Sequence, residues 1–142
     1  MAILAAVAAL SMACGGGGGG STPTAPSGNT GGTGNSGGTG NTNNDPPVAT
    51  TTITITSAGV NPARITVSPG TRVTFINNDS RSHEMNSDPH PTHGDCPGID
   101  DIGFIQPGQT KLTGNLSVVR TCGYHDHNQP DVRSLQGQIV VQ

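Results

Sequence analysis

Cys122, His125 and His127 place one thiol and two imidazoles close together near the end of the chain. Thiolate sulfur and imidazole nitrogen are donors that bind soft and borderline transition metals. The stretch 121–127 is separated by polar residues from an alternating apolar run, 135–141, so we expect it to be a short loop between two strands. The spacing therefore predicts that this loop supplies more than one ligand to a redox-active metal ion.

The other histidines lie in the same part of the chain, because all five fall between positions 83 and 127. This concentration favours ligand roles over structural roles for His83 and His125. His127 would share the side-chain direction of His125 in an extended chain, which makes it an additional or alternative ligand. His90 and His93 belong to a loop rich in proline, and we expect them to be loop residues first and alternative ligands second.

Composition limits what the chain can build from 142 residues. Roughly the first third cannot form a compact core, so about 95 residues remain for one small domain. Hydrophobic residues make up 30% of the chain and aromatic residues 2%, which predicts a thin core of Ile, Val and Leu. The six basic residues are spread singly and form no basic stripe, so we expect no nucleic-acid partner.

The first fourteen residues form a short apolar run that ends in small residues and Cys14. The run is too short to span a bilayer and resembles the signal peptide of a bacterial lipoprotein. That resemblance implies export, with a lipid on Cys14 anchoring the mature protein to a membrane; an ordinary secretory signal is the alternative. Residues 15–47 are almost entirely Gly, Ser, Thr, Asn and Pro with a single charge, and they predict a flexible tether.

Cys122 has a second potential use besides metal binding. If Cys14 carries a lipid, Cys96 and Cys122 remain as a pair in an oxidising compartment, where paired cysteines commonly form a disulfide. The bond would close a loop of about 25 residues, worth roughly 3 kcal/mol in the chain-entropy treatment. A disulfide excludes Cys122 as a ligand and leaves an imidazole-only site, so the sequence keeps both uses open.

Residues 48–142 predict an all-β domain. Short runs of alternating apolar and polar residues are separated by Asn-Pro, Pro-Gly and Asn-rich turns, and no segment of ten or more residues has a helical apolar stripe. Several short strands at such intervals in under 100 residues are typical of a Greek-key β-sandwich. The expected strands are 51–56, 63–67, 71–76, 102–105, 111–116, 117–122 and 138–141.

Two separated parts of this domain resemble the cupredoxins, the family of plastocyanin and azurin. The first part comprises 60–67, 69–75, the Asn77-Asn78-Asp79 turn and His83; the second is Cys122-x-x-His125 followed by Leu135-x-Gly137-x-Ile139-x-Val141. The resemblance implies one copper ion that carries single electrons, bound by His83, Cys122 and His125. Leu135 stands where the family has its axial methionine, and its side chain cannot bind a metal.

Three functional hypotheses follow. The first is a membrane-tethered, extracytoplasmic copper protein with a monomeric head that exchanges electrons with redox partners near the membrane. The second is a copper-binding or copper-handling module with a Cys96–Cys122 disulfide and a histidine-only site, and the third is a metal-free β-sandwich that binds a partner. We expect no enzymatic activity, because the sequence offers neither a second copper site nor a nucleophile with its base and oxyanion donors.

Overall fold

The computed structural model describes residues 45–142. The predicted signal peptide with Cys14, and all but the last residues of the predicted tether, lie outside the described residues. Among residues 45–142, no helix combines the length and apolar character needed to cross a membrane.

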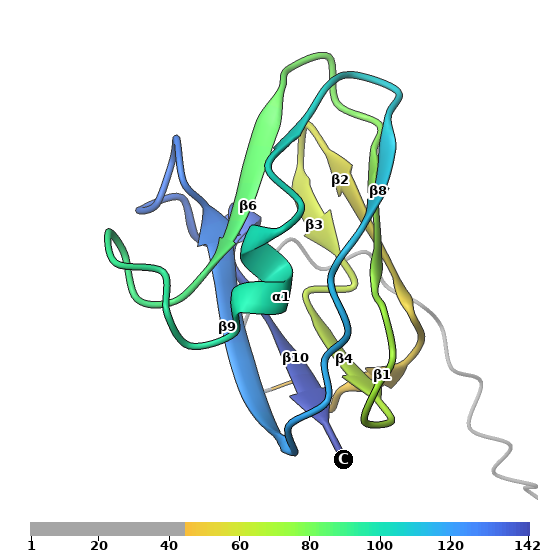
Figure 1. The fold of residues 1–142 in the computed structure, drawn as a ribbon. Helices are drawn as coiled ribbons and strands as arrows, with labels where there is room; N and C mark the ends of the chain where they lie inside the picture. The colour runs from red at the N-terminus through yellow and green to blue at the C-terminus, as the bar shows by residue number, and fades with distance from the viewer. Residues whose placement is uncertain (1–44) are drawn as a thin grey trace, which may run out of the picture. The chain divides into compact units, whose positions relative to one another are not determined.

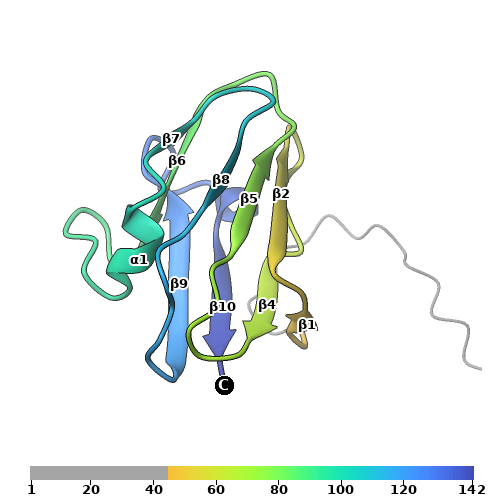
Figure 2. The ribbon, with the colours of Figure 1, turned by 45° about the vertical axis from the view of Figure 1, so that its right-hand side comes forward.

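Two β-sheets make up the described part of the chain (Figures 1 and 2). The larger sheet has the strand order β1-β4-β10-β9-β6-β7, and the smaller has the order β3-β2-β5-β8. A short helix, α1 (Pro97–Asp100), lies beside β6 and β9, and a 3-10 turn, η1 (Arg133–Leu135), precedes the last strand. The strands are β1 (Val48–Ala49), β2 (Thr52–Thr56), β3 (Gly59–Asn61), β4 (Arg64–Val67), β5 (Thr74–Asn77), β6 (His83–Ser87), β7 (Phe104–Ile105), β8 (Thr110–Leu112), β9 (Arg120–Asp126) and β10 (Gly137–Val141).

The alternating patterns predict the strands that pack the core. In β2, Ile53 and Ile55 are fully buried while the threonines between them are partly exposed. β10 runs parallel to β4 and antiparallel to β9, so Ile139 lies between Ile65 and Cys122 across the larger sheet. The prediction of an all-β sandwich is therefore confirmed, and its two sheets meet through apolar side chains. Phe75 and Tyr124, one from each sheet, make an edge-to-face contact with ring centroids 5.4 Å apart.

The sequence prediction was wrong for the segment 121–127, most of which is strand rather than loop. β9 continues to Asp126, where it pairs with Met85 of β6. The alternation along β9 sends Cys122, Tyr124 and Asp126 into the sandwich and His125 to the outer face. The predicted strand 117–122 covers only the beginning of β9, because the inward position 126 is a carboxylate, and β6 is missing from the expected strands because His83 occupies an inward position.

A disulfide joins Cys96 to Cys122, with their Cα atoms 5.9 Å apart. Cys96 immediately precedes α1 and ends the loop 88–95, and Cys122 lies in the middle of β9. The bond therefore attaches that loop to the strand beneath it. With a sequence separation of 26 between its cysteines, the bond is worth about 3 kcal/mol in the chain-entropy treatment.

Candidate metal centre

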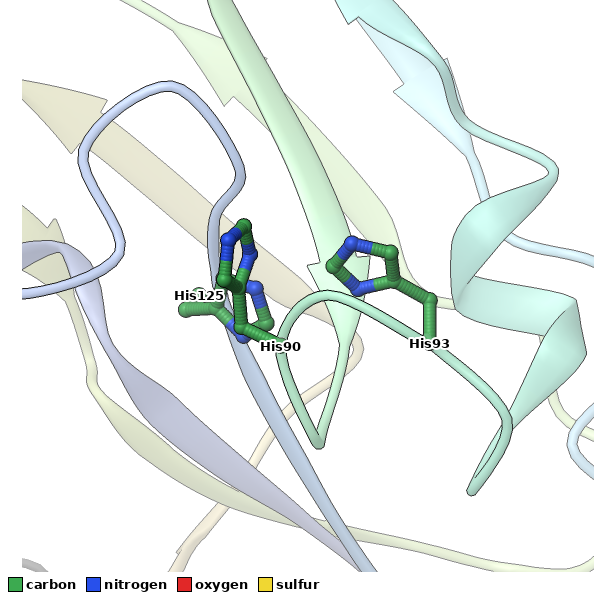
Figure 3. Close-up of side chains that lie close together, drawn as sticks. All are labelled: His90, His93 and His125. Carbon is green, nitrogen blue, oxygen red and sulfur yellow. The ribbon is translucent and has the colours of Figure 1, made fainter.

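Three imidazoles converge on the outer side of the larger sheet (Figure 3). His90 and His93 come from the loop 88–95 after β6, and His125 comes from β9. One ring nitrogen from each side chain lies within 4.8 Å of the corresponding nitrogens of the other two. This spacing allows a single metal ion to contact all three.

Backbone contacts hold the loop against β9. The Asp88 N–H donates to the Gly123 carbonyl at 3.1 Å, and the Asp95 N–H donates to the Asp88 carbonyl at 3.1 Å. A Cβ at position 123 would collide with the Asp88 carboxylate, so glycine there leaves room for the Asp88 side chain against the strand. Together with the disulfide at Cys96, these contacts fix both ends of the segment that carries two of the imidazoles.

His125 has the arrangement expected of a metal ligand. Its ring is buried, and Nδ1 lies 2.7 Å from Oδ1 of Asp88, which accepts the Nδ1 proton and leaves the Nε2 lone pair free. Nε2 is also buried, and it has no hydrogen-bond partner among residues 45–142. Leaving such a buried polar atom unpaired costs free energy, and a metal ion at Nε2 would remove that cost.

The rings of His93 and His127 are in contact within the same group of imidazoles. The Nδ1–H of His93 donates to the Ser87 carbonyl at 2.9 Å, so its Nε2 is left as an acceptor. That Nε2 lies 2.8 Å from Nδ1 of His127, so without an ion one proton lies between these two nitrogens, and a metal bound at Nε2 of His93 would replace this hydrogen bond. The sequence expectation that His127 shares the direction of His125 agrees with this position.

His90 is the exposed member of the cluster. Its ring centroid lies 5.4 Å from that of His93, 5.5 Å from that of His125 and 5.1 Å from that of His127. Desolvation, together with the charge that the neighbouring imidazoles would carry, lowers the pKa of His90, whereas Asp131 opposes this shift. A lowered pKa favours the neutral form, which is the form that binds metal.

These donors fit a transition-metal ion. All four are imidazole nitrogens, which suit copper and zinc, and two have their second nitrogen hydrogen-bonded to a carboxylate or carbonyl, as metal-binding histidines commonly do. No thiolate takes part. The cluster therefore offers nitrogen donors to a metal ion, and one of them, His90, is open to solvent.

The prediction that Cys122 is a copper thiolate is corrected by the disulfide. A sulfur bonded to Cys96 has no thiolate charge to donate, and its side chain also faces into the sandwich, whereas His125 faces outward. The disulfide of the alternative prediction, Cys96–Cys122, is present in the structure, and the imidazole-only site that goes with it stays a prediction.

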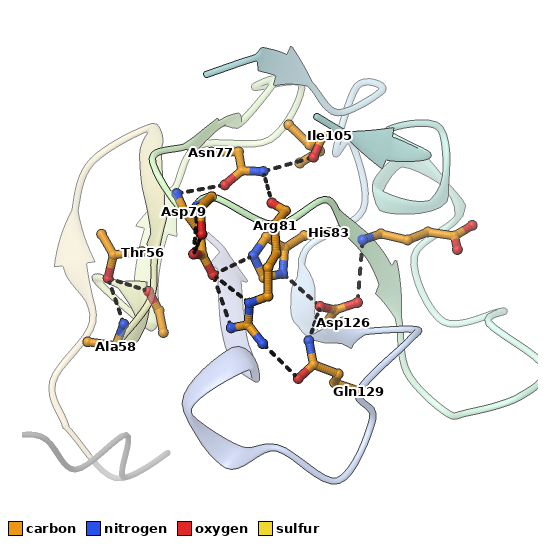
Figure 4. Close-up of polar contacts among 12 residues, drawn as sticks. Thr56, Ala58, Asn77, Asp79, Arg81, His83, Ile105, Asp126 and Gln129 are labelled. Carbon is orange, nitrogen blue, oxygen red and sulfur yellow. Dashed lines mark hydrogen bonds and ion pairs between the residues drawn. The ribbon is translucent and has the colours of Figure 1, made fainter. Parts of the chain in front are cut away.

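His83 is not part of the cluster. Both of its ring nitrogens lie within hydrogen-bond distance of carboxylates (Figure 4). Nδ1 lies 2.7 Å from Oδ2 of Asp126 and Nε2 lies 3.1 Å from Oδ2 of Asp79. Arg81 approaches the same Asp79 oxygen at 3.0 Å. The ring is fully buried, and both of its nitrogens already have carboxylate partners, so neither is free to bind a metal ion.

The residue of β9 that lies against His83 explains why the cupredoxin-like motif leads to the wrong ligands. The cupredoxin resemblance implies a thiolate next to His83, but the structure puts the Asp126 carboxylate there. Cys122 lies four residues earlier on the same strand, about 13 Å away at 3.3 Å per residue. Gln129, three residues after Asp126, approaches Asp126 at 3.4 Å, so a carboxylate and an amide occupy positions spaced like the Cys-x-x-His motif.

Leu135 lies in η1 and is buried in the hydrophobic core. Sequence reasoning gave too little weight to His90 and His93 and did not consider Asp88. The signal was available in two spacings, His90-x-x-His93 and His125-x-His127, each of which can direct two imidazoles to one point. Nothing local in the sequence indicates that the two pairs meet, because this depends on the loop crossing β9.

No protein-family model and no curated protein sequence matches the chain. Among solved structures, the oxidised plastocyanin of the fern Dryopteris crassirhizoma superposes with a TM-score of 0.51 at 16% identity, over 64% of this chain and 99% of that chain. A reduced Cu(I) form of an amicyanin mutant superposes with a TM-score of 0.50 at 16% identity, over 70% of this chain and 89% of that chain. At such identities the likeness concerns architecture, and it agrees with the two-sheet topology and with the resemblance in sequence. Residues 45–142 therefore form a domain with the cupredoxin fold.

Proposed function

We propose that this domain is a copper-binding or copper-handling module that holds one ion through His90, His93 and His125, with His127 as a further donor. The observation that carries the proposal is the buried, unpaired Nε2 of His125, oriented by Asp88 toward a group of imidazoles. One ion is proposed because the rings form a single cluster.

Copper is favoured over other metals by the donor set. Imidazole nitrogen accepts Cu(II) well, and among divalent first-row metals Cu(II) binds nitrogen sites most tightly. The amicyanin structure of similar fold is described as a Cu(I) form, so at least one protein with this architecture binds copper. Bound copper would supply a Lewis-acidic centre with one-electron redox chemistry. The chain's own residues would orient the imidazoles and shield His125 from solvent.

Single-electron transfer to redox partners rested on the Cys122 thiolate. An imidazole-only set lacks the sulfur donor that favours Cu(I), so binding and handling of copper is the function that the geometry supports better than rapid electron exchange. The disulfide supports an extracytoplasmic location, because such bonds persist in oxidising compartments. We further propose that a lipid on Cys14 tethers a monomeric head domain to a bacterial membrane.

Copper titration of the full chain carrying Cys14→Ser, which prevents lipidation, tests the function. We expect one Cu(II) per chain, a faint d–d absorption, nitrogen hyperfine structure in the electron paramagnetic resonance spectrum, and no free thiol after denaturation. His125→Ala should abolish tight binding, whereas His83→Gln should retain it because His83 lies outside the cluster. Absence of copper binding would favour the metal-free sandwich, and an intense visible band with two free thiols would restore the thiolate site.

The tether is tested separately by mass spectrometry of the mature protein from bacterial membranes. A diacylglyceryl group on an N-terminal Cys14 is the expected product. Release of the Cys14→Ser chain into the soluble fraction is expected as well, and a soluble wild-type chain would contradict the anchor.

A further inference from the structure

A pocket of about 480 Å³ opens directly beside the histidine cluster. His90 and His125 line it together with Asp88 and Asp131, and the remaining lining residues are Tyr124, Pro130, Gln136, Gly137 and Gln138. This volume lies within the range of small-ligand pockets. A metal ion held by the cluster would therefore border a space large enough for a second molecule.

The wall of this pocket carries negative charge. Asp88 and Asp131 are its two charged residues apart from the imidazoles, and no Lys or Arg lines it. The Asp88 side chain is about half exposed even while it accepts the His125 proton. Asp131 is exposed and acts electrostatically on His90, so its carboxylate lies near the ligand that is most open to solvent.

Charge in the pocket selects among molecules that carry a donor atom for the ion. A neutral nitrogen donor can bind the metal without an anionic group having to approach the two carboxylates. A positive charge at the far end of the same molecule would be attracted by Asp131, and a negative charge there would be repelled. The chain's net charge of −3, which a bound Cu(II) reduces to −1 (−3 + 2), acts in the same direction at longer range.

We propose that the pocket admits a second ligand to the bound ion: a small molecule with a neutral nitrogen donor at one end and a positive charge at the other. This inference rests on the proposed copper site. The step is a ligand association in which the nitrogen lone pair forms a coordinate bond to the ion and no electron is transferred. Small amine-bearing molecules would thereby have access to the copper while the protein still holds it.

Three pyridines of matched shape test the proposal on the copper-loaded Cys14→Ser chain. 4-(Aminomethyl)pyridine carries a positive charge, 4-methylpyridine is neutral and isonicotinate is negative, and none of them can chelate through the ring nitrogen and its para substituent. Binding is followed by the shift of the d–d absorption, and ultrafiltration measures the copper that stays with the protein. We expect the cationic pyridine to bind about three- to fivefold more tightly than the anionic one, in line with one partly exposed ion pair.

Asp131→Asn should bring the cationic and anionic affinities together. The matched control is Asp101→Asn, which removes the same charge from an exposed position on the helix side of the domain that does not line the pocket. It should leave the preference intact. Circular dichroism of both variants shows whether the fold is retained.

Several results would overturn the proposal. Equal affinities for the three pyridines, no spectral shift with any of them, or copper appearing in the filtrate would each contradict a ligand-admitting pocket. An equal loss of preference in both variants would assign the effect to net charge instead. Failure of the chain to bind copper in the first titration refutes the proposed function itself, so the two failures are distinguishable.

Discussion

The carboxylate of Asp88 determines which nitrogen of His125 is available. By accepting the Nδ1 proton at 2.7 Å, it fixes the tautomer and directs the Nε2 lone pair toward His90 and His93. A partner of this kind raises the basicity of a metal-binding imidazole and holds its orientation. Asp88 can reach this position because residue 123 is glycine.

Asp88→Ala is expected to weaken copper binding by about 10- to 100-fold while leaving the fold intact. A competition titration with a chelator of known affinity measures the change, and Asp101→Asn serves as the control. Unchanged affinity in Asp88→Ala would show that His125 is oriented by other contacts.

The carboxyl group of Asp79 is expected to make the stability of the domain depend on pH in acid. Burial raises its pKa, but hydrogen bonds from Arg81, the Ser80 N–H and His83 outweigh burial and lower the pKa to about 2 from an ordinary 3.8. A lowered pKa means that the folded state binds a proton less readily than the unfolded state. The contribution of Asp79 to stability is therefore fully present above pH 3.8 and is lost as the pH falls through about 2.

Urea unfolding at pH 5 and at pH 2.5 measures this contribution. The wild-type domain should lose more stability between the two values than Asp79→Asn, which lacks the titrating group. If both proteins lose the same amount, the hydrogen bonds to Asp79 do not contribute to stability.

At the scale of elements, the loop 88–95 and β9 form one unit because the Cys96–Cys122 bond joins them. The loop supplies His90 and His93, and β9 supplies His125. The position of His90 and His93 relative to His125 therefore depends on the disulfide, whose cysteines are not part of the histidine cluster. α1 begins at the residue after Cys96, so the same bond also holds the helix against the sheet.

Replacing both cysteines with serine (Cys96→Ser and Cys122→Ser) should lower the free energy of unfolding by about 3 kcal/mol. Copper affinity should fall as well, because the loop gains freedom that metal binding must then remove. Urea denaturation and copper titration measure the two effects. Unchanged affinity would show that the hydrogen bonds of the loop suffice to position its histidines.

The same elements show how far the sequence could predict the structure. β2, β4 and β10 follow strict apolar alternation, so periodicity finds them. β6 and β9 place His83 and Asp126 at inward positions, where the two side chains satisfy each other across the strands, and no single-strand pattern reveals such a pair. The histidine cluster was only partly predictable for a related reason. The spacings His90-x-x-His93 and His125-x-His127 are visible in the sequence, whereas the contact between the loop and β9 that brings them together exists only in the folded domain.

For the whole molecule, the cluster lies on the outer side of the larger sheet rather than between the sheets. The interior near His83 is filled by the hydrogen bonds of its ring with the carboxylates of Asp79 and Asp126. A copper ion on the outside would still join the loop 88–95 to β9. A metal ion that binds only the folded chain raises its free energy of unfolding. The gain grows with the logarithm of the free metal concentration divided by the dissociation constant.

Copper at about 100 times its dissociation constant should therefore add about 2.7 kcal/mol to the stability of the wild-type domain. Calorimetry or thermal unfolding with and without Cu(II) measures the gain, and His125→Ala should show none. An equal gain in both proteins would indicate nonspecific binding.

The sheets end in short strands. β1 and β7 at the edges of the larger sheet have two residues each, and β3 and β8 at the edges of the smaller sheet have three each. Edge strands this short offer few unpaired backbone groups to a neighbouring chain. Copies of the domain crowded together on one surface are thus protected from joining edge to edge, which would otherwise be the first route to aggregation for a β-protein at high local concentration.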